Sequence, residues 1–223
     1  MIGHPRVHFR LTDSTNERAR SLAASRAPHG TLVTADEQRA GRGRQGRDWT
    51  APPGTAVLMS VVLRELSETL PLAAAVAVSE AVPLEARIKW PNDVWIDGRK
   101  VAGILVEGRP QEGWAVLGIG LNVTTEEFPS ELNATSLRLA GADVSPAAAL
   151  ASLVDALRLW LPRPRSEVLA AWRSRDALVG RTVRWSNGSN EGTAAGVDDS
   201  GALIVETRNG RVTLDAGEVH LER

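Results

Sequence analysis

The sequence predicts an α+β fold: a mixed β-sheet with packed helices, followed by a small C-terminal β-barrel of the SH3-like kind. Three observations predict it. Apolar runs of strand length alternate with helical patterns through most of the chain, and one two-residue hairpin signal joins two of these runs. Roughly the last 45 residues instead carry short β-rich segments separated by Asn-Gly and Asp-Ser-Gly turns. We therefore expect two domains, residues 1–176 and 177–223.

The first third of the chain supplies the opening strands and helices. Residues 7–10 have the composition of a strand, and Ser14 and Glu17 have the spacing of a capping box before a helix over 15–25. Ser14 and Thr15 can serve this cap alone, or their hydroxyl and N–H groups can face a ligand at the helix start. The pattern then predicts a strand over 31–35, a central strand buried on both faces over 56–63, and an Ala- and Val-rich helix over 69–81.

A β-hairpin follows. Asp97-Gly98 between two apolar runs is the strongest short-range hairpin signal, through a type I′ turn. This turn places Lys100 at the start of the returning strand, close to Asn92 and Asp93 on its partner.

The next strand, over 114–122, contains Gly118 and Gly120, which lie on one face because side chains alternate along a strand. Glycines inside a strand indicate either the close approach of a ligand or the tight packing of a helix. The sequence leaves both interpretations open.

The remaining elements follow from periodicity and turns. Ser145-Pro146 is a helix start, and the apolar stripe that follows is assigned to the core: Ala149, Leu150, Leu153, Leu157 and Trp160. A short helix is expected over 166–173, and short strands are expected over 181–185, 192–197, 202–207 and 211–214.

The residues from Arg39 to Trp49 predict an anion-binding loop. Arg39, Arg42, Arg44 and Arg47 alternate there with glycines, which let backbone N–H groups approach an anion, and arginine holds phosphate or carboxylate by paired hydrogen bonds. The segment also matches G-x-G-x-x-G, but the Pro-Pro-Gly run at 52–54 cannot open the helix that a dinucleotide-binding loop requires. A solvated basic loop that binds nucleic acid non-specifically is the remaining alternative.

Composition excludes several kinds of chemistry. The formal net charge is −1, so the arginine cluster is local. The chain has no cysteine and four scattered histidines, which disfavours thiolate, zinc and serine-hydrolase chemistry. It shows neither a signal peptide nor a membrane-spanning run, so we expect a cytoplasmic protein without membrane attachment. Of 26 basic residues only Lys89 and Lys100 are lysine, which indicates that a compact ammonium group is needed there.

Five ordered motifs resemble the catalytic and C-terminal domains of bacterial biotin protein ligases (biotin–acetyl-CoA-carboxylase ligases) over nearly the whole chain. They are Asp13-Ser14-Thr15-Asn16; Gln38 with Gly41 to Arg47 and Trp49; Lys89 to Asp93; Gly98 to Glu107; and Gly118 to Asn122. The resemblance implies a catalytic domain like those of class II aminoacyl-tRNA synthetases. Because the chain starts only about a dozen residues before Ser14, without the DNA-binding domain of repressor-type members, it resembles the ligase-only form. We expect no sequence-specific DNA binding.

The resemblance implies a two-step reaction. The carboxylate of biotin attacks the α-phosphate of Mg·ATP, giving biotinyl-5′-AMP and pyrophosphate, and a lysine of biotin carboxyl carrier protein then attacks the mixed anhydride. Fixed positive charge around the transferred group assists the first step, and a closed loop keeps the adenylate from water. Biotin and ATP are thus expected as substrates, Mg²⁺ as the metal with ligands unknown, and the carrier protein as the partner. The resemblance also allows a homodimer.

The resemblance also implies roles for individual residues. The catalytic residues would be Lys100, Arg44, Asp93 and Lys89. Biotin would be bound by Ser14, Thr15, Gln38, Gly41, Arg42, Lys100, Gly103, Leu105, Gly118 and Gly120. ATP would be bound by Arg42, Arg44, Arg47, Trp49, Lys89, Asn92, Lys100 and Asn122. Trp49 would stack on adenine and Asn122 would read its edge, whereas Asn92 and Asp93 could position either the metal or the incoming amine.

A lipoate ligase or octanoyltransferase, similar in fold, is the main alternative. The absence of cysteine disfavours the thiol-dependent transferases, and lipoate ligases lack the Arg-rich loop.

Overall fold

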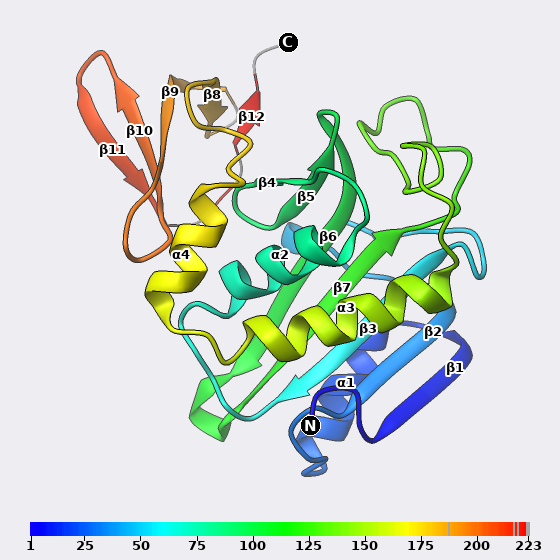
Figure 1. Ribbon diagram of the computed structural model, residues 1–223. Helices are drawn as coiled ribbons and strands as arrows, with labels where there is room; N and C mark the ends of the chain where they lie inside the picture. The colour runs from blue at the N-terminus through cyan, green and yellow to red at the C-terminus, as the bar shows by residue number, and fades with distance from the viewer. Residues whose placement is uncertain (187, 216, 218, 222–223) are drawn as a thin grey trace.

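The computed structural model describes all residues except 187, 216, 218 and 222–223 (Figure 1). Its larger part holds seven strands and four helices. The strands are β1 (Arg6–Thr12), β2 (Leu32–Gln38), β3 (Ala56–Leu63), β4 (Arg87–Lys89), β5 (Asp93–Ile96), β6 (Arg99–Arg109) and β7 (Trp114–Asn122). The helices are α1 (Thr15–Ala24), α2 (Leu70–Ala81), α3 (Pro146–Trp160) and α4 (Arg165–Arg173). Strands and helices interleave as the sequence pattern predicts.

The seven strands form one mixed sheet in the order β1-β2-β3-β7-β6-β5-β4. Only β1 and β2 pair in parallel, and the other neighbours are antiparallel. Every residue of β3 is buried, because the strand lies in the sheet interior with packing on both faces. The predicted α+β class and the central position of β3 are therefore confirmed.

Helices cover the two faces of the sheet unequally. On one face α2 and α3 pack together over a continuous apolar core, and of the α-helices in the described residues α1 packs on the other face, against β2, β3 and β7 (Figure 1). The core under α1 is small: Ala19, Ala23, Val33, Val62, Trp114 and Val116. A single ten-residue helix cannot cover a whole sheet face, so the part of this face beyond the start of α1 is free to form a site.

The hairpin prediction is confirmed in detail. Asp97 and Gly98 have φ values of 49° and 73°, the left-handed pair that a type I′ turn requires. The turn sets the register in which Asp93 on β5 faces Gly103 on β6. The hairpin thereby brings Lys100 on β6 back beside Asp93 on β5.

The C-terminal part is a five-stranded antiparallel sheet in the order β11-β10-β9-β8-β12. Its strands are β8 (Thr182–Trp185), β9 (Asn190–Val197), β10 (Leu203–Thr207), β11 (Gly210–Leu214) and β12 (His220–Leu221). Four were expected from the turn signals, whereas the two-residue β12 is too short to leave a sequence pattern. The division into domains at residue 176 remains a prediction.

The C-terminal sheet is attached to the edge of the larger sheet. On β4, the Ile88 N–H donates to the carbonyl of Arg175 at 2.7 Å, and the Ala177 N–H donates to the carbonyl of Ile88 at 2.9 Å. The indole N–H of Trp90 donates to the carbonyl of Gly201 at 3.1 Å. These bonds place the C-terminal sheet beside the β4–β6 end of the larger sheet.

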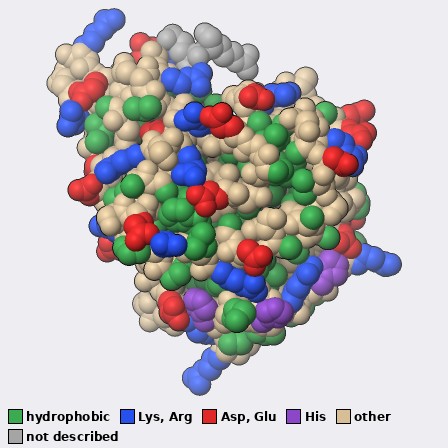
Figure 2. All heavy atoms as spheres, in the orientation of Figure 1, with side chains coloured by type: hydrophobic (Ala, Val, Ile, Leu, Met, Phe, Trp, Pro, Cys, Tyr) green, Lys and Arg blue, Asp and Glu red, His purple; other side chains and the backbone are tan. Residues whose placement is uncertain are grey.

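The surface over α2 and α3 carries interspersed acidic and basic side chains (Figure 2). Many of them are paired, as in Arg175 with Glu80 at 2.7 Å and Arg163 with Glu167 at 2.9 Å. A face of mixed sign does not have the basic stripe that non-specific nucleic-acid binding requires. In the part of the chain that the structure describes, no helix is long and apolar enough to cross a membrane.

Candidate active site

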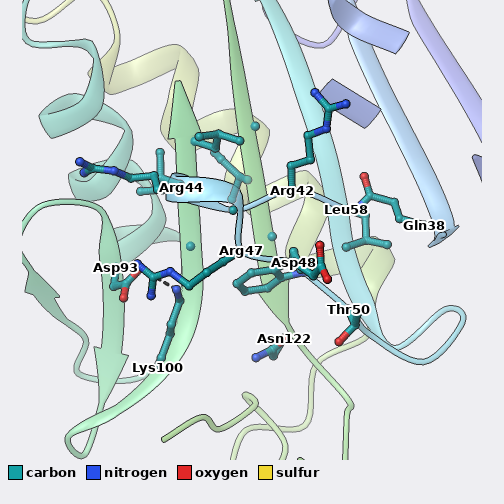
Figure 3. Close-up of a pocket in the computed structure, with 18 of the residues that line it drawn as sticks. Gln38, Arg42, Arg44, Arg47, Asp48, Thr50, Leu58, Asp93, Lys100 and Asn122 are labelled. Carbon is teal, nitrogen blue, oxygen red and sulfur yellow. Dashed lines mark ion pairs between the residues drawn. The ribbon is translucent and has the colours of Figure 1, made fainter. Parts of the chain in front are cut away.

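A cavity of about 250 Å³ opens on the α1 face of the sheet, between the start of α1 and the Arg39–Trp49 loop (Figure 3). Most of the residues predicted for the site line it. These are Ser14, Thr15, Gln38, Arg42, Arg44, Arg47, Trp49, Asn92, Asp93, Lys100, Gly103, Leu105, Gly118, Gly120 and Asn122. Segments from five different parts of the chain thus meet at one site.

The floor of the cavity consists of strands that lack large side chains. Register places Gly120 between Leu58 on β3 and Gly103 on β6, and places Gly118 opposite Leu105. Because side chains alternate along a strand, these residues share one face of the sheet. Three glycines in two neighbouring strands leave a slot in that face.

Gly118 and Gly120 each accommodate a neighbouring side chain. A Cβ at Gly118 would lie 2.8 Å from Cγ of Asn16, and a Cβ at Gly120 would lie 2.6 Å from Cζ2 and Nε1 of Trp49. Both distances are too short for real contacts, so a side chain at either residue would displace Asn16 or Trp49. The sequence left ligand approach and helix packing open; Asn16 of α1 packs over Gly118, while both glycines also line the cavity.

The start of α1 presents polar groups to the cavity. The Thr15 N–H donates to Oε1 of Gln38 at 2.7 Å, and the Thr15 hydroxyl lies 3.0 Å from the same oxygen. Ser14 occupies the N-cap position, but its side chain makes no capping hydrogen bond. The capping-box interpretation is therefore wrong for the side chains: Gln38 satisfies the helix start, and Glu17 pairs with Arg42 at 3.2 Å.

The Arg-rich loop folds back on itself around a short 3-10 turn, Arg44–Gly46. The Gly43 N–H donates to the carbonyl of Arg47 at 2.6 Å, and the Trp49 N–H donates to the carbonyl of Gly41 at 2.9 Å. Gly41 is buried beside Gln38, whose Nε2 would lie 2.7 Å from a Cβ there. This turn confirms that the loop does not open a helix of the dinucleotide-binding type.

The arginines of the loop spread in different directions (Figure 3). Arg47 extends toward Asp93 and Lys100, whereas Arg42 and Arg44 point away from each other. Burial lowers the pKa of Arg44, an effect that Asp93 opposes and Arg47 reinforces. Because the separation limits their mutual repulsion, the guanidinium groups can surround an extended anion such as a polyphosphate.

Lys100 is at the centre of the charged end of the cavity. Its Nζ lies 2.7 Å from Oδ1 of Asp93 and 5.5 Å from the centroid of the Trp49 ring. Lys89 lies nearby but outside the lining, with its Nζ 5.5 Å from the Trp95 ring centroid. Burial lowers the pKa of Lys89; Asp93 partly offsets this, whereas Lys100 and Arg47 add to it.

The two predicted asparagines are anchored to backbone. Nδ2 of Asn92 donates to the carbonyl of Ile104 at 2.6 Å, and Nδ2 of Asn122 donates to the carbonyl of Thr135 at 3.0 Å. These bonds fix β5 against β6 and fix the 123–144 segment against β7. The predicted contacts with nucleotide would be made by their remaining polar groups.

Sequence reasoning missed part of the lining. The missed residues are Asn16, Gly43, Asp48, Thr50, Leu58, Met59, Ile104, Ile119, Phe128, Leu132, Asn133 and Ala134. Asn16 was recognisable, since it belongs to the Asp13-Ser14-Thr15-Asn16 motif. The segment around Asn133 has no periodic pattern; it is held by the Lys100 N–H, which donates to the Asn133 carbonyl at 2.9 Å.

The cavity therefore has a neutral polar end and a cationic end. Thr15, Asn16 and Gln38 offer both hydrogen-bond donors and acceptors at one end, while Lys100 and Arg47 supply positive charge at the other. Among the described residues, no cluster of three or more His, Asp or Glu side chains could hold a metal ion alone. The arrangement suits a molecule with a polar ring, an apolar stretch and a carboxylate or phosphate.

Comparisons with known proteins agree with this arrangement. The biotin/lipoate A/B protein ligase family model matches residues 8–123, and the biotin protein ligase C-terminal domain model matches residues 182–221. The chain is 35% identical to the biotin–[acetyl-CoA-carboxylase] ligase of Paracoccus denitrificans, over 93% of this chain and 97% of that one. It is also 35% identical to the bifunctional ligase/repressor BirA of Bacillus subtilis, over 99% of this chain and 75% of that one.

A solved structure shows the same architecture. The biotin protein ligase from Aquifex aeolicus in complex with biotin and ATP superposes with a TM-score of 0.84 and 29% identity, covering 99% of both chains. The match extends over the catalytic sheet and the C-terminal sheet together, which confirms the predicted combination of folds. The chain belongs to the biotin/lipoate A/B protein ligase family.

Proposed function

We propose that the chain is an ATP-dependent biotin ligase that acts on the biotin carboxyl carrier protein of acetyl-CoA carboxylase. The single observation that carries the proposal is the two-ended cavity, with neutral polar groups at the start of α1 and a lysine–aspartate pair at the Asp97-Gly98 hairpin. Relatives named for this activity, and a neighbour solved with biotin and ATP, support the same assignment.

The geometry suggests how biotin would lie. Its ureido ring would meet Thr15 and Gln38, and its ring system would lie against the indole of Trp49, which fills the slot above Gly103 and Gly120. Trp49 would thus form one wall of the biotin site, in addition to its predicted stacking on adenine. The valeryl chain would then direct the carboxylate toward Lys100.

Lys100 would bring two anions together. Placed between the biotin carboxylate and the α-phosphate, its ammonium group offsets their repulsion as a carboxylate oxygen bonds to phosphorus and the bond to the pyrophosphate oxygen breaks. Arg47 extends toward the same place, while Arg42 and Arg44 would hold the outer phosphates. Lys89, which lies outside the cavity lining, would add positive electrostatic potential at the α-phosphate.

Asp93 would serve the second step. The lysine nitrogen of the carrier attacks the acyl carbon of biotinyl-5′-AMP, the bond from carbon to the phosphate oxygen breaks, and AMP leaves. Asp93, 2.7 Å from Lys100, would orient the incoming amine and hold the proton that it releases.

Mg²⁺ would be carried mainly by the substrate phosphates. Asp48 and Asp93 are the carboxylates that line the cavity in the described part of the chain, and Mg²⁺ sites that include substrate phosphates need only one or two protein carboxylates. The metal would supply charge neutralisation at the phosphates. We propose a cytoplasmic location and the domain division at residue 176 on the composition and turn signals alone.

The proposal is tested by isotope exchange between pyrophosphate and ATP without carrier protein. We expect exchange that depends on biotin and Mg²⁺, since the first step is reversible and needs no acceptor. Lipoate is the matched control, because the family includes both kinds of ligase. Exchange supported by lipoate in place of biotin would reassign the substrate, and exchange with neither would refute adenylation. Thermal shift with biotin, ATP and an oligonucleotide in turn should show stabilisation by the first two only.

A further inference from the structure

A chain of buried and partly buried hydrogen bonds connects the ureido end of the cavity to a carboxylate 91 residues away in the sequence. Asn16 is 5% exposed and lines the cavity. Its Nδ2 donates to Oε2 of Glu107 at 2.8 Å, and its Oδ1 accepts from the Ser60 hydroxyl at 2.6 Å. The other carboxylate oxygen of Glu107 lies 3.4 Å from Nη1 of Arg20.

The direction of these bonds is set by Glu107. An amide can turn over and exchange its oxygen and nitrogen, and a hydroxyl such as Ser60 can bond to either. A carboxylate has no proton to give, so only Nδ2 of Asn16 can face it. Oδ1 is then turned toward Ser60 and Gly118, close enough that a Cβ on Gly118 would overlap it.

The neighbouring amide is fixed in the opposite sense. Oε1 of Gln38 receives the Thr15 N–H at 2.7 Å, which turns Nε2 toward Gly41. The wall therefore offers a hydrogen-bond acceptor over Gly118 and a donor beside Gly41. A cyclic urea, with N–H and C=O groups on one edge, matches this pair.

We propose that Glu107 is a positioning residue that fixes the amide orientation of Asn16 and so selects a ligand ring that donates a hydrogen bond over Gly118. The inference rests on the proposed biotin-dependent activity and deepens it. Glu107 lies on the same face of β6 as Gly103 and Leu105, beyond the cavity lining, and acts through Asn16. Arg20, one turn after Asn16 on α1, holds the second carboxylate oxygen.

Glu107→Gln reverses the arrangement. A glutamine side chain has a single amide oxygen. Because that oxygen would accept a hydrogen bond from the charged Arg20, the glutamine Nε2 would face Asn16. The Asn16 amide would then have to turn over. The atom over Gly118 then changes from an acceptor to a donor. A ring that donates at this position loses its partner, whereas a ring that accepts there gains one.

The test compares biotin with the two cyclic carbamate analogues in which one ureido N–H is replaced by oxygen. In biotin-dependent pyrophosphate exchange, we expect Glu107→Gln to raise KM for biotin at least about tenfold with kcat within about twofold of wild type, as for loss of uniform binding. For the analogue whose ring oxygen lies over Gly118, the ratio of kcat/KM for biotin to kcat/KM for the analogue should be at least about tenfold smaller in Glu107→Gln than in wild type. Glu107→Asp keeps a carboxylate, which can only accept hydrogen bonds, and should therefore keep the wild-type preference for biotin over the analogues.

Ser60→Ala is the control for a purely structural effect. It removes the hydroxyl that lies 2.6 Å from Oδ1 of Asn16 and 2.8 Å from Oγ1 of Thr15, but it leaves Glu107 in control of the Asn16 amide. We therefore expect a lower melting temperature with an unchanged preference between biotin and the analogues. Equal changes in KM for biotin and both analogues in Glu107→Gln would overturn the inference, as would a narrowed preference in Ser60→Ala. A wild-type protein without biotin-dependent exchange would instead refute the proposed function and the inference with it.

Discussion

Replacing Lys100 with arginine tests whether a compact ammonium group is required in the cavity. Nζ of Lys100 lies 2.7 Å from Asp93, and Cε and Nζ would both lie 3.3 Å from a Cβ on Gly103, so the side chain is packed along the floor of the slot. Trp49 closes the other side, with its ring centroid 5.5 Å from Nζ. Lys100→Arg conserves the charge but adds a planar fork in this confined space.

The structure gives the size of the expected effect. An arginine places its terminal nitrogens one covalent bond, about 1.3 Å, beyond the lysine nitrogen. Since it must either displace Trp49 or enter the space for the carboxylate, the charge is misplaced by about 1 Å, which can cost up to a hundredfold in rate. We expect adenylation to fall by about ten- to a hundredfold, equivalent to roughly 1.4–2.7 kcal/mol of transition-state stabilisation.

The assay is biotin-dependent pyrophosphate exchange, with Arg99→Lys as the matched control. Arg99 is exposed and adjacent to Lys100, so its replacement also conserves charge in the same hairpin but should leave the rate within about twofold. Thermal melts should show that both variants fold. Equal activity in the two variants would refute the reasoning, because it would show that any cation at residue 100 suffices.

Three further predictions concern the slot, the loop and the C-terminal connection. Gly120→Ala puts a methyl group 2.6 Å from Trp49 ring atoms, so the ring must move. We expect the free energy of unfolding to fall by roughly 1–3 kcal/mol in denaturant titrations. Biotin affinity should fall at least about tenfold in calorimetry. Arg44→Gly removes a charge-assisted contact of roughly 1.5–3 kcal/mol, so biotinyl-AMP should leave ten- to a hundredfold faster after rapid dilution and label bystander lysines; wild-type retention would show that Arg44 is only a surface charge. Burial raises the pKa of Asp176 above 3.8, so the folded state favours the protonated acid and loses stability as pH rises through that pKa. Relative to wild type, Asp176→Asn should therefore gain stability in urea titrations as the pH rises above the pKa of an unfolded aspartate, about 3.9. A stability difference that does not change with pH would contradict the burial argument.

Local chemistry explains why much of the fold was predictable. The Asp97-Gly98 turn needs two residues with positive φ, and the chain supplies the residue pair that best tolerates it, so the register that brings Lys100 to Asp93 follows from four or five neighbouring residues. The same holds for Ser145, whose hydroxyl accepts from the Ala148 N–H at 3.2 Å as its spacing predicts. In such features the interacting residues are close in sequence, so few other partners can replace them.

The failures have a different cause. Ser14 and Glu17 have the spacing of a capping box, but Gln38 reaches the helix start from 23 residues away and Arg42 captures the acid. Which partner wins depends on how β2 and the loop lie beside α1, and local spacing cannot show this. The pairing of Asn16 with Glu107 and the attachment of the segment around Asn133 are likewise tertiary contacts between residues that carry no mutual pattern.

The two ends of the cavity draw mainly on different elements, and this difference has a functional consequence. The neutral end depends on α1, β2 and β3, where Ser60 and Thr15 are buried, together with the partly buried Glu107 of β6, which holds Asn16. The cationic end depends on the β5–β6 hairpin and the Arg39–Trp49 loop, which is held to α1 through the exposed pair of Arg42 and Glu17. Recognition of the ring is thus assigned to rigid packing, while charge is supplied by a loop whose contacts exchange readily with solvent. Changes at the neutral end should therefore alter KM for biotin, whereas changes at the cationic end should alter kcat.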